Sequence, residues 1–161
     1  MSNIGDFYAL LGAMSVTFTA QNDDAIALTA YYDDSLRNSV QASGTPCRLL
    51  LPYSDRDVMA ATVQNWQIGN VAPVTWTVID QLLWRPVALG QGLEDSAQDL
   101  REYMAAYITA VMSFDASSIS DRMITESVTI ALRDDIMFPS GSGNWYIGAD
   151  VTWTVIEDDP V

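Results

Sequence analysis

The sequence predicts an α+β domain in which helices pack against an antiparallel β-sheet. The string Val-Thr-Trp-Thr-Val-Ile occurs at 74–79 and again at 151–156, and a carboxylate follows each copy. Each copy alternates residue by residue, as a strand with two different faces does, and its residue types suit a pleated surface. The segments follow the order helix, strands, helix, strand hairpin, which is typical of an α+β domain. We therefore expect the two copies to be equivalent strands of one sheet.

The first third of the chain begins with a predicted helix. Apolar side chains are spaced three or four positions apart over 4–14, which is the helical period. Residues 16–18 can begin a strand, and a possible strand over 26–32 lies between Asp-rich turn signals. The apolar run 46–52 has proline at both ends, which suits a short buried strand.

A hairpin is expected in the middle of the chain. Alternation resumes over 58–66, the five residues 69–73 break it, and 74–84 form a long strand. Pro86 and the glycines at 90 and 92 end this strand and free the backbone to turn.

The strongest helical pattern covers about 93–112. Twenty residues make a helix roughly 30 Å long, enough to cross a sheet. The predicted apolar stripe consists of Leu93, Ala97, Leu100, Met104, Tyr107, Ile108 and Val111.

The last quarter of the chain is expected to form a second hairpin. After a connector at 114–120, we expect a strand at 127–132, a glycine-rich turn at 139–144 and a closing strand at 145–156.

The chain length indicates a single domain. A chain of 161 residues can bury one core and is too short for two ordinary domains. We therefore expect one α+β domain over 1–161, with an N-terminal helix and irregular segment at 1–45 and a sheet-helix-hairpin core at 46–161. The short N-terminal helix and the long helix are expected to pack against the same antiparallel sheet.

The charge balance excludes several partners. The chain has 21 acidic and 7 basic residues, all of the latter Arg, for a formal net charge of −14. Seven scattered Arg cannot form the basic stripe that holds nucleic acid or an anionic membrane. An acidic surface is useful where DNA must slide past without sticking, and it also gives solubility in strong salt. These two explanations stay open.

The residue types predict no catalytic, cofactor or metal site. Without His or Lys, and with Cys47 as the single cysteine, the chain cannot form a Ser-His-Asp triad, a Cys-His pair or a zinc cluster. Adjacent acidic pairs lie beside turns, where Asp is common for backbone reasons, and none has calcium-loop spacing. We expect no enzyme, although a pair of carboxylates acting on a sugar remains the alternative. Cys47 is expected in the core.

No secretory signal or membrane-spanning run is evident in the sequence. The first residues lack a positive flank and an apolar core, and no stretch approaches the roughly 18 consecutive apolar residues of a transmembrane helix. We expect a soluble protein that is made in a cytoplasm and does not bind membranes.

Several segments from residue 46 onward, taken in order, resemble tailed-phage tail-terminator or tail-completion proteins. They are Pro-Cys-Arg-Leu-Leu-Leu-Pro at 46–52, Asp-Gln-Leu-Leu-Trp at 80–84, Arg-Pro-Val-Ala-Leu-Gly-Gln-Gly-Leu at 85–93 before the long helix with Tyr103 and Tyr107, and Gly-Asn-Trp-Tyr-Ile-Gly at 143–148. The region over which these segments are spread makes up about two-thirds of the chain.

This resemblance implies a structural virion protein. The subunit would close into a ring of about six copies at the head-proximal end of a non-contractile tail. It would stop tube growth, contact tail-tube and neck proteins, and let DNA pass through its lumen without specific binding. It would be assembled in the host cytoplasm and would need no cofactor.

A ring requires one face of the subunit to meet a different face of its neighbour. We expect this interface on the strands around 76–85 and 145–153, because Trp, Tyr and Arg most often anchor interfaces. Arg85 in particular is expected to have a carboxylate partner, within the chain or across subunits. The candidate interface residues are Trp76, Trp84, Arg85, Trp145, Tyr146 and Trp153.

Two kinds of alternative stay open at the sequence level. A tail-tube subunit or a neck adaptor would also be a small ring-forming sheet protein. A carbohydrate-binding or adhesin module would instead be a monomer whose exposed Trp residues stack on sugars.

Overall fold

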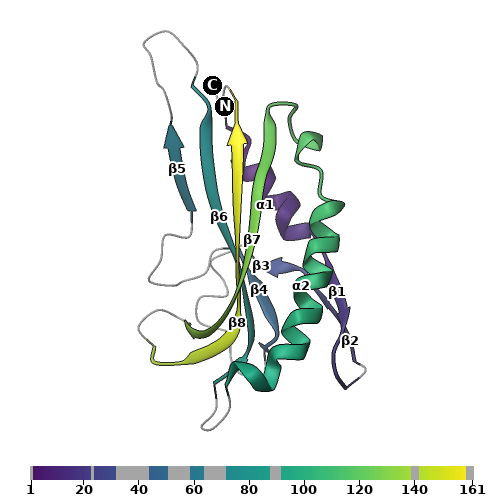
Figure 1. Ribbon diagram of the computed structural model, residues 1–161. Helices are drawn as coiled ribbons and strands as arrows, with labels where there is room; N and C mark the ends of the chain where they lie inside the picture. Colours follow the sequence, from purple (N-terminus) through teal and green to yellow (C-terminus); the bar gives the residue numbers. More distant parts are fainter. Residues whose placement is uncertain are drawn as a thin grey trace.

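The computed structural model describes residues 2–22, 24–31, 44–50, 59–63, 72–87, 92–138 and 142–158. Its main elements lie in one sheet with helices against one face (Figure 1). In chain order they are α1 (Ile4–Ala13), β1 (Val16–Thr19), β2 (Ala25–Leu28), β3 (Ala30–Tyr31), β4 (Cys47–Leu49), β5 (Met59–Val63), β6 (Val74–Pro86), the 3-10 turn η3 (Leu93–Ser96), α2 (Ala97–Met112), the 3-10 turn η4 (Ala116–Ser118), β7 (Met123–Met137) and β8 (Trp145–Glu157).

The main sheet confirms the predicted α+β class. Its strands follow the order β3-β4-β6-β8-β7. β5 also pairs with β6, at residues 74–78, whereas β4 pairs with residues 81–83 of the same strand. Every pair is antiparallel except the short pairing of β3 with β4, which is parallel. β1 and β2 form a separate antiparallel pair.

The two copies of the repeated string pair directly with each other. Val74 lies opposite Glu157, Asp80 lies opposite Val151, and Thr77 faces Thr154 at the centre. The expectation of two equivalent strands in one sheet is confirmed. Because the strands are antiparallel and in register, the same side chains occupy related positions about a local two-fold axis between the central threonines.

The helices form where the sequence predicts them. η3 and α2 together run from Leu93 to Met112, and α1 runs from Ile4 to Ala13. The buried stripe of α2, however, consists of Leu100, Tyr103 and Tyr107. The prediction that Ile108 belongs to this stripe is wrong, since its side chain is 54% exposed. Position 108 lies one step of about 100° around the helix from Tyr107, which turns it toward β7 and solvent.

The core lies between the helices and one face of the sheet. Trp153 on β8 is fully buried, and the rings of Phe7 and Phe114 approach it with centroid distances of 5.8 and 4.8 Å. Leu11, Val16 and Phe18 belong to the same cluster. Residues before position 45 therefore contribute to the same core as the sheet-helix-hairpin segment.

Several strand bounds differ from the predictions. The possible strand at 26–32 is two short strands, β2 and β3, and the run 46–52 contributes only β4. Predicted strand positions 32, 51, 52, 58 and 64–66 lie outside the described residues, as do turn positions 69–71 and 139–141 and the glycine at 90. β7 is much longer than 127–132, and β6 continues through Pro86.

Candidate functional site: the outer sheet face and its two ends

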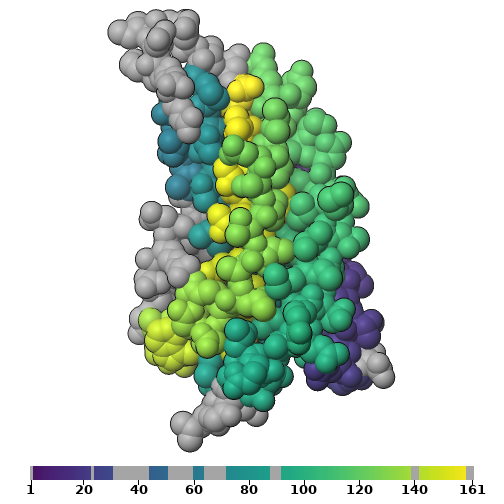
Figure 2. Space-filling view, in the orientation of Figure 1, coloured from purple at the N-terminus to yellow at the C-terminus, as the bar shows by residue number. Residues whose placement is uncertain are grey.

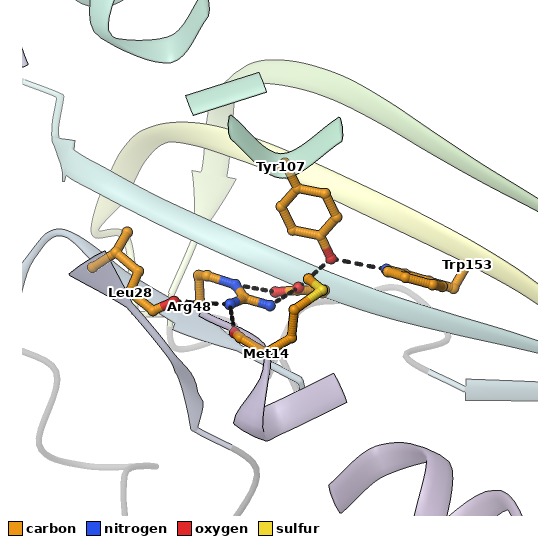
Figure 3. A network of polar contacts seen from close by, with 6 residues as sticks. Met14, Leu28, Arg48, Tyr107 and Trp153 are labelled. Atoms are coloured by element: carbon orange, nitrogen blue, oxygen red, sulfur yellow. Dashed lines mark hydrogen bonds and ion pairs between the residues drawn. The ribbon is translucent and has the colours of Figure 1, made fainter. Parts of the chain in front are cut away.

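A buried ion pair joins the sheet to the helices. The Arg48 guanidinium and the Asp80 carboxylate are both 0% exposed, with 2.5 Å between Nη2 and Oδ2 and 3.3 Å between Nε and Oδ1. Arg48 Nη1 also donates to the carbonyls of Met14 and Leu28, at 2.7 and 3.0 Å. Figure 3 shows how these contacts converge on the arginine from separate segments.

The same carboxylate extends the network to α2 and β8. The Tyr107 hydroxyl donates to Asp80 Oδ2 at 2.5 Å and accepts from the Trp153 indole N–H at 2.8 Å (Figure 3). Burial raises the pKa of Tyr107, and the neighbouring Asp80 charge raises it further. Burial alone would lower the pKa of Arg48, but Asp80 outweighs it and the net shift is upward. The network thus keeps Arg48 charged and Tyr107 neutral, which suits a structural role.

Glu157 ends the second repeat and holds the N-terminal segment. Its carboxylate accepts hydrogen bonds from the Asn3 backbone N–H at 2.6 Å, the Asn3 side chain at 3.3 Å, the Ser2 hydroxyl at 2.7 Å and the Trp76 indole N–H at 3.0 Å. Burial would raise the pKa of Glu157, but these donors outweigh it and hold the pKa below its ordinary 4.5. The candidate interface residue Trp76 therefore uses its one polar group within the chain.

Replacing Glu157 with Gln is expected to make the free energy of unfolding fall less steeply as the pH is lowered. The carboxylate contributes stability above its ordinary, unfolded-state pKa of 4.5, and this stability is lost as the pH falls through the lower folded-state pKa. At pH 7 the variant should be less stable by about 1–3 kcal/mol. Urea unfolding at pH 7, 5 and 3 measures both effects. Glu126→Gln, at an exposed position of β7, is the control, and an equal loss in both variants would contradict the prediction.

Among the described residues, the sheet face opposite the helices presents mainly Thr, Ser, Ala and Ile side chains over its first half. On this outer face β6 and β8 present only Thr and Ile between their buried positions, and all are half-buried. Figure 2 shows side chains of β6, β8 and β7 side by side at the surface, with no helix crossing them. We define the outer face by Ala60, Thr62, Thr75, Thr77, Ile79, Ile124, Ser127, Thr129, Thr152, Thr154 and Ile156.

The second half of this face has its own small core. Cys47, Leu49, Leu83, Ile136, Phe138 and Tyr146 form one buried cluster. Cys47 is buried as predicted, and burial raises the pKa of its thiol to about 11. A polar row lies beside the cluster. In it Arg133 Nη1 donates to Asp150 at 2.7 Å, and Gln81 Nε2 donates to the other oxygen of that carboxylate at 2.7 Å.

One flank of the sheet ends in β7, and the other ends in β5 and, beyond β4, in β3. Within the described residues, β7 pairs only with β8 and β5 pairs only with β6. β5 is uncharged, and Ala60, Ala61, Thr62 and Val63 are all exposed. An uncharged edge strand is a template for pairing with another strand.

Of the six candidate interface residues, Trp84, Arg85, Trp145 and Tyr146 gather where β6 ends and β8 begins. Pro86 pairs with Tyr146, Arg85 with Ile147, and the Val87 N–H donates to the Trp145 carbonyl at 2.8 Å. Trp84 and Tyr146 are buried within the chain, whereas Trp145 is 45% exposed.

The other two candidates lie toward the opposite end of the sheet. Trp153 is 0% exposed, so its surface is covered entirely within one chain, and Trp76 is half-buried against the same core. Exposure thus leaves Trp76, Arg85 and Trp145 as the candidates with surface to offer a partner.

Sequence analysis missed the Arg48–Asp80 pair. The sequence does contain an indication of this pair, because Arg48 and Asp80 are charged residues inside apolar strand segments. Such residues are buried almost only when they are paired. Only the three-dimensional pairing of β4 with β6 brings them together.

Two apolar grooves flank α2. One, of about 590 Å³, lies between α1, β1 and α2 and is lined by residues such as Leu10, Ala106 and Phe114. The other, of about 380 Å³, lies between α2 and β7, where Ile108 and Met112 are exposed.

The described segments hold neither a cluster of possible metal ligands nor a helix that could span a membrane. They contain no group of three or more His, Cys, Asp or Glu side chains placed to hold a metal ion. In the same part of the chain, no helix has the length and apolar character needed to cross a membrane.

Comparison with known proteins gives no family assignment. No protein-family model matches the chain, and no curated protein matches its sequence.

Proposed function

We propose that this chain is a structural subunit of a phage tail, a tail-terminator or tail-completion protein that closes into a ring and joins the tail to the neck. The observation that carries the proposal is that β5 and β7 lie on opposite flanks of one sheet and that each pairs with a single strand among the described residues. Two different surfaces that can bind each other make a heterologous interface, and such interfaces generate rings when the rotation closes.

The strand directions are compatible with such a ring. β5 is antiparallel to β6, β6 to β8, and β8 to β7, so β5 and β7 run in opposite directions. Copies related by rotation about an axis roughly along the strands keep their strand directions. The β7 edge of one copy would then meet the β5 edge of the next in the antiparallel sense, and the sheet could continue around the ring.

The distribution of charge supports the same function. A net charge of −14 makes copies repel each other wherever their acidic surfaces meet, so contacts between copies favour uncharged surfaces. The β5 edge, the β7 segment 127–132 between the two bulges and the outer face are such surfaces. Neither the acidic surface nor the outer face offers the cations that would retain DNA in a lumen.

Light scattering on the purified protein, followed by negative-stain imaging of the same sample, tests the proposal. We expect rings of about six copies and no long tubes, because heterologous contacts that close by rotation stop growing. Long tubes would indicate a tail-tube subunit, and rings that bind only neck proteins would indicate an adaptor. A monomer at every concentration, alone and with isolated tail tubes, would contradict the proposal.

One observation favours a second candidate, a carbohydrate-binding module. Trp145 is 45% exposed, and exposed indoles stack on sugar rings. In that case soluble glycans would protect Trp145 from a fluorescence quencher, and the protein would remain a monomer of 17.7 kDa.

A further inference from the structure

The groove between α2 and β7 exposes apolar side chains along one flank of the sheet. It measures about 380 Å³, and Ile108 and Met112 on its α2 side are 54% and 83% exposed. Val128 and Ile130 of β7 line the other side, and of the described lining residues only Glu126 is charged. We call it the α2–β7 groove. Exposed apolar side chains that gather in one place mark an interaction site, whereas single ones do not.

On the opposite flank, β5 carries apolar side chains that its own chain leaves uncovered (Figure 1). Ala61 pairs with Trp76, whose side chain packs against the core on the helix side, and Val63 lies two positions further along the strand. Ala61 and Val63 therefore point to the helix side of the sheet. Both are exposed, Val63 by 54%, so no described helix of the same chain covers them.

β5 and the α2–β7 groove lie at the same height in the sheet. Through β6 and β8, Met59 shares a row with Trp153 and Val128, and Ala61 shares a row with Thr125. Thr125, Val128 and Trp153 are all among the residues that line the groove. Rotation about an axis along the strands leaves heights unchanged. It would therefore bring β5 of one copy to the groove of the next.

Strand direction, sheet face and charge make β5 of a second copy a fitting occupant. β5 and β7 run in opposite directions, so an added β5 is antiparallel to β7. Each face of a sheet continues across such a contact, so Ala61 and Val63 would point toward Ile108 and Met112. β5 carries no charge, whereas an acidic segment of this chain would be repelled by Glu126 and would lose hydration in the groove.

We propose that the α2–β7 groove binds β5 of a second copy of this chain. β5 adds to the edge of β7 as an antiparallel strand, and its Ala61 and Val63 side chains pack against Ile108 and Met112 of α2. This inference rests on the proposed function and deepens it, because it names the side chains that hold neighbouring copies together.

The experiment places a carboxylate on either side of this contact, each with a control on the same element. Val63→Asp adds the charge on the helix side of β5, and Thr62→Asp adds it on the outer face of the same strand. Met112→Asp adds it in the α2–β7 groove, and Thr109→Asp adds it on α2 where the helix lines the other groove. Light scattering over a dilution series gives the apparent dissociation constant of the assembly. Urea unfolding of the dilute monomers gives their stability.

We expect Val63→Asp and Met112→Asp each to weaken assembly about 100-fold or more, because each would bury a carboxylate without a partner in an apolar contact. Thr62→Asp and Thr109→Asp keep their charges in water and should weaken assembly less than about tenfold. Each of the four dilute monomers should unfold at nearly the same urea concentration as its control, since all four side chains are exposed in a single copy.

Mixing the two assembly-deficient variants tests whether β5 meets the groove. A Val63→Asp copy keeps an intact groove and a Met112→Asp copy keeps an intact β5, so one wild-type contact can form between them. At high concentration the mixture should give pairs with twice the 17.7 kDa mass of the chain, and no rings. Neither variant alone should associate under the same conditions.

The outcomes separate this inference from the proposed function. Rings that survive Val63→Asp or Met112→Asp would overturn the inference and leave the function standing. A mixture without pairs would overturn it too, as would a Val63→Asp monomer less stable than the Thr62→Asp monomer. Wild-type tubes that both variants abolish, together with pairs in the mixture, would support the inference while contradicting the terminator function. A wild-type protein that never self-associates, alone or with tail tubes, would contradict both.

Discussion

Replacing Arg48 with methionine is expected to destabilise the protein by about 3–5 kcal/mol. The change leaves the Asp80 carboxylate buried with only the Tyr107 hydroxyl as a described side-chain donor. It also leaves the carbonyls of Met14 and Leu28 without the guanidinium donor that they share. Since domains of this size are stable by about 5–15 kcal/mol, the single variant should be close to unfolding at 37 °C.

Adding Asp80→Asn to Arg48→Met should restore a large part of this stability. A neutral amide removes the unpaired buried charge and can still accept from Tyr107, and replacing both members of a buried ion pair is often nearly neutral. Urea unfolding of the wild type, both single variants and the double variant forms a double-mutant cycle. Strictly additive losses would contradict the strong coupling expected between the two residues.

Replacing Gly148 with alanine is expected to cost about 3 kcal/mol or more. A Cβ at this position would lie 1.8 Å from the Leu82 carbonyl oxygen and 3.1 Å from Ile136 Cδ1. The first of these atoms is backbone in β6, so the paired strands would have to move apart where Gly148 faces Leu83. The position lies in the middle of the sheet, which leaves little room for that movement.

Gly5→Ala is the matched control for this change. Gly5 lies in α1, and an added Cβ would meet nothing within 4 Å. Alanine in a helix is favoured over glycine by about 0.5–1 kcal/mol, so the same substitution should stabilise the protein there. Thermal and urea unfolding of the two variants should therefore move in opposite directions. Equal small shifts would show that β6 and β8 tolerate the extra atom.

The strands could be predicted where the side-chain alternation is uninterrupted. The repeated strings of β6 and β8 have a clear period of two, and both were predicted almost to their ends. β7 was predicted only over 127–132, and the reason is local. Its register shifts at Thr125/Ser127 and again at Arg133/Ile136, so alternation survives only between the two bulges.

The pairing of the two repeats with each other could not be predicted from their similarity. Two equivalent strands can be neighbours or lie apart, and only packing against α1 and α2 decides between these arrangements. The exposure of the candidate interface residues could not be predicted either, because residue type alone does not determine how a side chain packs. Trp84 and Trp145 are the same residue type near the same end of the sheet, yet one packs against Phe18 in the core and the other is exposed. A register shift between Leu83 and Arg85 adds to this difficulty, because it interrupts the simple alternation of faces.

The anchoring of Ser2 and Asn3 by Glu157 has a practical consequence for labelling an assembly. It fixes the start of the chain beside the end of β8, whereas Trp145 and Arg85 lie at the other end of that strand. At about 3.3 Å per residue, the 13 residues of β8 separate the two ends by roughly 40 Å. In the proposed ring, a gold label placed ahead of Ser2 would therefore mark one rim and leave Trp145 and Arg85 uncovered. If that ring forms on a tail, such a label would show its polarity directly in electron micrographs.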